Sequence, residues 1–167
     1  MRRLIIVRHA KAEESEWDKS DYERRLRGKG RKDARLIAQA LKKARGVVPN
    51  HMISSPAPRA FETAEIFAEE LSFPRVSIQK EIELYDGIST QHFLQLIGQT
   101  DDSVRTLIVF GHNPSMETVA NNLLPSYMGA LPTTGTVSIL FDVDDWTEIN
   151  ARSGELEFFE YPKLYED

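Results

Sequence analysis

Two histidines and two arginines stand where apolar runs of this sequence end. Arg8 and His9 follow one apolar run, His112 follows another, and Arg59 opens a predicted helix just after a third short run. In open α/β sheets, ligands bind at the edge where the strands end. Guanidinium groups suit phosphate oxygens, and a neutral imidazole nitrogen is a nucleophile. These residue types therefore predict a metal-free phosphoryl-transfer site with a histidine nucleophile.

Phosphoryl transfer needs positive charge on the equatorial oxygens, an aligned nucleophile and an acid for the leaving group. We expect Arg8 and Arg59 to bind the oxygens. We expect His9 to attack phosphorus as a neutral ring, because two neighbouring arginines would lower its pKa. His112, as imidazolium or donor, would bind a further oxygen, and amides of a helix beginning near Asn113 would contribute substrate contacts. Each residue alone has a structural interpretation, and their joint occurrence at three strand ends favours a site.

Two other histidines lack this context. His51 opens a predicted strand and His92 lies inside a predicted amphipathic helix. A lone histidine in such a place is usually structural, so we assign neither one to the site.

Strand-like and helix-like segments alternate along the chain and must position these residues. The predicted strands cover residues 3–8, 50–54, 76–79 and 104–110, with two late strands at 136–142 and 155–161 around an acidic turn. The predicted helices cover residues 29–45, 58–71, 89–97 and 114–124, the last one with Asn113 as N-cap and Pro114 at the first position. This order predicts an α/β fold with a mixed, mostly parallel sheet and helices on both faces.

Bulk composition sets mild limits. A chain of 167 residues with 41% hydrophobic and 28% charged residues is expected to form one domain over residues 1–167. The absence of cysteine excludes thiolate catalysis and favours a cytoplasmic location. No apolar run reaches the roughly 18 residues of a membrane span. The net charge of −5 argues against nucleic acid as a partner.

Three short motifs, taken in order, resemble a known family. They are RHA at residues 8–10, SPAPRAFETA at 55–64 and GHNP at 111–114. Together they resemble the histidine phosphatase superfamily, whose fold is that of phosphoglycerate mutase. The short chain and the segment DYERRLRGKGR at residues 21–31 resemble its SixA-type branch of phosphohistidine phosphatases. The resemblance spans residues 3 to about 142.

The resemblance implies a three-layer α/β/α sandwich and a phosphohistidine intermediate on His9. It implies that Arg8, Arg59 and His112 form the phosphate pocket without a cofactor. Arg24 falls where members of the branch place a further phosphate-facing arginine. The implied substrate is phosphohistidine on a signalling protein, such as a histidine phosphotransfer domain.

The chain departs from the family pattern at three positions. Ala10 replaces a common glycine, which requires an ordinary backbone conformation there. Arg25 and Arg27 replace a common proline and threonine, and they add charge to a basic stretch at residues 24–35. That stretch is either a solvated helix face or an electrostatic funnel for an anionic phosphoprotein.

The general acid has two candidates after the third predicted strand. Asp86 is preferred and Glu83 is the second choice, although an Asp-Gly turn explains Asp86 equally well. SixA-type relatives often lack a carboxylate here. An imidazole leaving group can carry its own proton, whereas an alkoxide cannot leave unaided. A working Asp86 would therefore widen the substrate range towards phosphate esters.

Three other functions compete with a phosphohistidine phosphatase. The segment ILFDVDDW at residues 139–146 resembles the Asp-x-Asp element of haloacid-dehalogenase phosphatases, but too little chain follows it for that domain. A non-catalytic phosphoprotein-binding module would have lost His9 or His112. A phosphatase for small phosphate esters on the same fold is the serious alternative. The sequence leaves the oligomeric state open.

Overall fold

A six-stranded sheet forms the centre of the computed structural model, which describes residues 1–15 and 20–166. The strands are β1 (Arg2–Arg8), β2 (His51–Ser54), β3 (Gln79–Lys80), β4 (Thr106–Gly111), β5 (Thr136–Phe141) and β6 (Glu155–Glu160). The helices are α1 (Gly28–Lys43), α2 (Pro58–Glu70), α3 (Thr90–Ile97) and α4 (Ser115–Leu123). Within the described residues, no helix is both long and apolar enough to cross a membrane.

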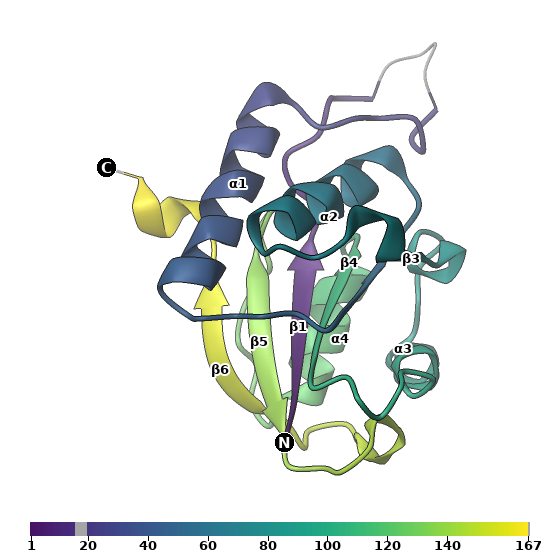
Figure 1. Cartoon of the computed structure of the whole chain (residues 1–167). Helices are drawn as coiled ribbons and strands as arrows, with labels where there is room; N and C mark the ends of the chain where they lie inside the picture. The colour runs from purple at the N-terminus through teal and green to yellow at the C-terminus, as the bar shows by residue number, and fades with distance from the viewer. Residues whose placement is uncertain (16–19, 167) are drawn as a thin grey trace.

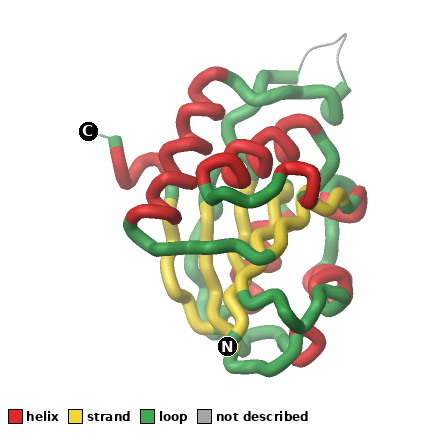
Figure 2. The backbone as a smooth tube through the Cα atoms, in the orientation of Figure 1, coloured by secondary structure: helices red, strands yellow, loops and turns green. Residues whose placement is uncertain are grey.

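The strand order is β3-β2-β4-β1-β5-β6, and the first four are parallel. β5 runs antiparallel to β1, and β6 antiparallel to β5. Helices α1 and α2 cover one face of the sheet, and α3 and α4 lie on the other side (Figures 1 and 2). The mixed, mostly parallel sheet and the three-layer α/β/α sandwich predicted from the sequence are therefore confirmed.

β1 and β4 lie in the middle of the sheet and bring the site together. Leu4, Ile5, Ile6 and Val7 have no exposed surface, as expected of a continuous apolar run between two helical layers. The parallel register pairs Arg8 with Gly111. The next residues of both strands, His9 and His112, therefore emerge side by side at the carboxyl edge of the sheet.

The third strand, predicted at residues 76–79, starts later in the structure. Residues 75–77 form a 3-10 turn, and the strand β3 covers only Gln79–Lys80. Val76 is 98% exposed, so the apolar run at this point has no buried face to hold it in the sheet.

The start of the fourth helix also differs from the prediction. Helix α4 begins at Ser115, so Pro114 precedes its first residue rather than occupying it. The Asn113–Pro114 peptide bond is cis. The N-cap is therefore Pro114 and not Asn113, but Asn113 lies one residue earlier and its Oδ1 accepts a hydrogen bond from the backbone N–H of Glu117 at 3.2 Å.

Candidate active site

A polar pocket of about 700 Å³ opens at the carboxyl edge of β1, β2 and β4. The sequence-predicted residues that line it are Arg8, His9, Arg24, Arg59, Asp86, His112 and Asn113. They come from five separate stretches of the chain. The crossover connections of a parallel sheet return each strand to the same edge, which explains why these stretches meet.

His9 is held as a neutral ring with one defined free nitrogen. Its Nδ1 lies 2.7 Å from the carbonyl oxygen of Ala10, which can only accept, so Nδ1 carries the proton. The other nitrogen, Nε2, then holds a lone pair. Burial, together with the charges of Arg59 and Arg8, lowers the pKa of His9 to about 4. The sequence-based expectation named the arginines as the cause, but burial has the larger effect.

His112 lies against His9, with ring centroids 5.1 Å apart. Its Nε2 is 2.8 Å from the hydroxyl oxygen of Ser55, which also accepts a hydrogen bond from the backbone N–H of Ala57. Donation from the Ser55 hydroxyl to Nε2 would place the proton of His112 on Nδ1. Burial, with a smaller contribution from His9, lowers the pKa of His112 to about 3. Both rings are neutral at pH 7.

Arg59 lies in the first turn of α2 and is only 4% exposed. Its Nη1 donates to the backbone carbonyl of Asp21 at 2.7 Å, and its Nη2 donates to Asp21 Oδ2 at 2.9 Å. These two bonds occupy one end of the guanidinium group and set its orientation.

Arg8 and Arg24 reach the pocket from two other directions. Arg8 Nη1 donates to the carbonyl of Leu131 at 3.1 Å. Arg24 Nη1 donates to the hydroxyl of Ser15 at 3.3 Å and lies 3.5 Å from a carboxylate oxygen of Asp21. Each side chain is thus anchored through a terminal nitrogen.

Four buried nitrogen atoms of this pocket have no hydrogen-bond partner within the described part of the chain. They are the Nε atoms of Arg8, Arg24 and Arg59, and Nδ1 of His112. An unsatisfied buried donor costs about 1–3 kcal/mol, so proteins rarely keep several together. The three guanidinium groups line one pocket with both histidines, and their positive charge favours an anion with several oxygen acceptors there.

The remaining predicted residues stand at the margin of the pocket. Asp86 lines it but is exposed to solvent. Glu83 lies outside its lining, and its carboxylate is 3.4 Å from His92. Asn113 lines the pocket, but its Nδ2 donates to the carbonyl of Leu131 at 2.9 Å. The side-chain amide of Asn113 therefore holds the segment that contains Leu131.

Sequence reasoning missed two residues, Asp21 and Tyr85. The Tyr85 hydroxyl donates to Asp21 Oδ2 at 2.9 Å, on the same oxygen that binds Arg59. Burial pushes the pKa of Asp21 upward, but Tyr85 and Arg59 outweigh that effect and hold it below its ordinary value. The Tyr85 ring also packs edge-on against His112. Asp21 and Tyr85 are 64 positions apart, and no local pattern links them.

The basic stretch at residues 24–35 divides between two roles. Arg24 lines the pocket, whereas Arg31 pairs with Glu62 at 2.7 Å and Arg35 with Glu70 at 3.1 Å. The helix part of the stretch is thus a solvated face with ion pairs to α2. Electrostatic attraction of an anionic phosphoprotein therefore remains a hypothesis only for the basic residues before α1, which are Arg24, Arg25 and Arg27.

The chain is similar to several known proteins in sequence and in fold. Residues 4–122 match the family described as "Histidine phosphatase superfamily (branch 1)". The structure of the protein histidine phosphatase SixA complexed with tungstate is 24% identical, with a TM-score of 0.83 over 98% of this chain and 99% of that one. A candidate phosphohistidine phosphatase SixA from Agrobacterium tumefaciens is 26% identical, with a TM-score of 0.78 over 96% and 98%.

Two further proteins are similar to this chain. A mycobacterial glucosyl-3-phosphoglycerate phosphatase shares the fold, with 16% identity and a TM-score of 0.66 over 93% of this chain and 97% of that one. An uncharacterized chloroplastic protein of Arabidopsis thaliana is 28% identical over 160 residues, which cover 92% of this chain and 72% of the relative. The cytoplasmic location expected from the sequence stays a prediction.

Proposed function

The chain belongs to branch 1 of the histidine phosphatase superfamily, and from this premise we propose that it is a phosphohistidine phosphatase acting through His9. The observation that carries the proposal is one pocket that gathers the guanidinium donors of Arg8, Arg24 and Arg59 with His112 and with His9, whose Nε2 is free. A phosphoryl group supplies oxygen acceptors for those donors and a phosphorus atom for the nucleophile.

In the first step, Nε2 of His9 attacks phosphorus and forms a P–N bond. The P–N bond of the substrate breaks, and its electron pair stays on the substrate nitrogen. The imidazole leaves as a neutral ring because its other nitrogen already carries a proton. Arg8, Arg24, Arg59 and His112 bind the oxygens of the phosphoryl group in transit. In the second step, water attacks the phosphorylated His9, releases inorganic phosphate and restores the neutral ring.

The carboxylates near the site favour phosphohistidine over a phosphate ester. An alkoxide leaving group needs a positioned acid with a pKa near the working pH, whereas imidazole can carry its own proton. Asp21 is ionised, because its pKa lies below the ordinary value, and Asp86 is exposed to solvent. The name of the Agrobacterium relative, at 26% identity, supports the same substrate class.

Hydrolysis of small phosphate esters is the second candidate. Asp86 favours it, because this residue lines the pocket and its carboxyl group, when protonated, would donate that proton to the ester oxygen. The substrate class of the mycobacterial relative is consistent with this alternative on the same fold.

A direct test compares phosphate release from two substrates in the presence of EDTA. The substrates are a histidine phosphotransfer domain phosphorylated on its histidine and an aryl phosphate monoester. We expect faster release from the phosphoprotein, abolished in His9→Ala and retained in His92→Ala, whose ring lies on the exposed face of α3. Faster ester hydrolysis would favour the second candidate. Activity that requires a metal, or survives in His9→Ala, would exclude the proposed mechanism.

A further inference from the structure

A second pocket of about 430 Å³ adjoins the catalytic pocket. We call it the side pocket; its lining includes Ala130, Pro132, Phe159, Tyr161 and Lys163. Lys11 and Thr133 line both pockets, so these two residues stand between them. A protein bound with a phosphoryl group at His9 has only these two residues to cross to reach the side pocket.

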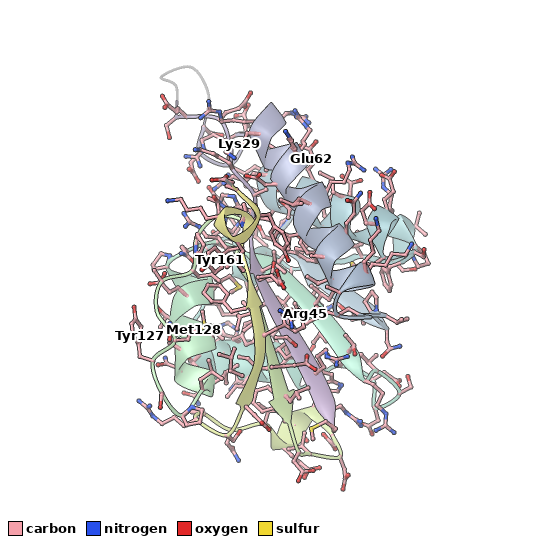
Figure 3. The ribbon with its side chains drawn as sticks, turned by 90° about the vertical axis from the view of Figure 1, so that its left-hand side faces the viewer. Lys29, Arg45, Glu62, Tyr127, Met128 and Tyr161 are labelled. Atoms are coloured by element: carbon pink, nitrogen blue, oxygen red, sulfur yellow. The ribbon has the colours of Figure 1, made fainter. Side chains whose placement is uncertain are left out.

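One wall of the side pocket is apolar and aromatic. The rings of Phe159 and Tyr161, at the end of β6, lie 4.9 Å apart, and Pro132 and Ala130 belong to the same lining. Figure 3 views this side of the molecule, with Tyr161 below the C-terminal turn and Lys29 above it. Such a wall suits an aliphatic or aromatic side chain, whereas a sugar would require convergent hydrogen-bonding groups.

Two lysines give the side pocket a positive rim. Lys11 and Lys163 are exposed, and within residues 1–15 and 20–166 neither side chain makes a hydrogen bond or ion pair. The lining also contains two carboxylates, and Lys29 pairs with both of them, with Asp33 at 3.5 Å and with Glu166 at 3.2 Å. The free lysines are available to carboxylates of a bound partner.

Backbone contacts fix the side pocket relative to His9. The carbonyl of Lys11 accepts a hydrogen bond from the N–H of Arg27 at 2.9 Å. The N–H of Thr134 lies 3.1 Å from the carbonyl oxygens of both Arg8 and His9. Lys11 and Thr133, the residues shared by the two pockets, are therefore held by backbone hydrogen bonds close to the end of β1, where His9 lies.

We propose that the side pocket binds the polypeptide segment beside the phosphorylated histidine of a protein substrate. An apolar side chain of that segment packs against Phe159 and Tyr161, and a neighbouring carboxylate pairs with Lys11 or Lys163. This inference rests on the proposed function, and it makes the enzyme selective for acidic, amphipathic protein segments over free phosphate compounds.

The test fills the side pocket and measures two substrates. Ala130 is exposed, so Ala130→Trp adds bulk to the pocket without a buried clash. The matched control is Gln99→Trp, at an exposed position that lines a separate surface pocket beside α3. The substrates are the phosphorylated histidine phosphotransfer domain and phosphoramidate, which carries the phosphoryl group with no polypeptide.

We expect Ala130→Trp to lower kcat/KM for the phosphoprotein by about tenfold. The effect should appear chiefly in KM, because the variant removes contacts between the side pocket and the bound polypeptide. Hydrolysis of phosphoramidate should change by less than about twofold, and Gln99→Trp should match the wild type on both substrates. Lys163→Glu should also weaken only the phosphoprotein reaction, with the difference shrinking at high salt.

The outcomes separate the two proposals. Wild-type enzyme that hydrolyses phosphoramidate but not the phosphoprotein contradicts the proposed substrate class. Wild-type activity on both, with Ala130→Trp and Lys163→Glu unchanged or weakened equally on both substrates, overturns the side pocket as a docking site and leaves the proposed function standing.

Discussion

Individual contacts decide which atoms of this site can react. The carbonyl of Ala10 holds the proton of His9 on Nδ1, and burial keeps the ring neutral, so Nε2 is free to act as a nucleophile. Arg59 is oriented in a similar way by two bonds to Asp21. The residues that we propose bind phosphate are thus themselves held by neighbours that need not touch it.

At this scale we predict that Asp21 positions Arg59. Asp21→Ala removes the carboxylate that fixes the guanidinium group, and a charge-assisted hydrogen bond contributes about 1.5–3 kcal/mol, so KM for phosphoramidate should rise by about tenfold or more. Asp21→Asn keeps an oxygen acceptor and should recover part of the loss, while Tyr85→Phe should have a smaller effect. KM and kcat, measured separately, check this.

The opposite result would have a definite meaning. If Asp21→Ala bound phosphoramidate more tightly than wild type, Asp21 would compete with the phosphoryl group for Arg59 instead of positioning it. Equal effects of the alanine and asparagine variants would also contradict a role for the oxygen acceptor.

At the scale of elements, helix α1 begins where it does because of tertiary contacts. Its N-cap, Arg27, makes no side-chain cap, and its first turn contains no acidic residue. A Cβ atom on Gly30 would lie 2.1 Å from the carbonyl oxygen of Lys11. The close approach of this helix to the loop after β1 therefore requires glycine, and it holds one wall of both pockets in place.

We predict that Gly30→Ala lowers the free energy of unfolding by about 1–3 kcal/mol, because backbone atoms must move to admit the methyl group. Gly28→Ala is the matched control in the same turn, since a Cβ there meets nothing within 4 Å. That control should be neutral or stabilising by up to about 1 kcal/mol. Urea denaturation measures both variants, and equal stabilities would show that the close contact relaxes without cost.

At the scale of the whole molecule, the site makes folding sensitive to pH. Burial holds the pKa of His9 at about 4 and that of His112 at about 3, compared with 6.5 in the unfolded chain. Below pH 6.5 the unfolded state therefore binds more protons than the folded state, so stability falls as the pH decreases.

We predict that the free energy of unfolding decreases steadily from pH 7 to pH 5, and that His9→Gln flattens this decrease. His92→Gln, which changes an exposed histidine, should keep the wild-type slope. Urea titrations at pH 7, 6 and 5 test the prediction. A slope that is the same in His9→Gln and wild type would mean that His9 is not held neutral by burial.

The sequence alone determined where the reactive residues are placed along the chain. Apolar runs predicted β1 and β4 and the polar residues at their ends, and parallel strands necessarily present those ends at one edge. Hence Arg8, His9, Arg59 and His112 could be grouped before any contact was known. The order and type of most elements followed from the same periodic patterns, because burial on one face imposes them.

Only the tertiary structure decided how those residues are held. The bond from Tyr85 to Asp21, the burial that sets the pKa of His9 and the pairing of Glu83 with His92 depend on distances between segments. The exposed Val76, which leaves only a short third strand, depends on which faces the helices cover. Local sequence patterns encode periodicity, whereas contacts across the fold arise only when all layers are packed together.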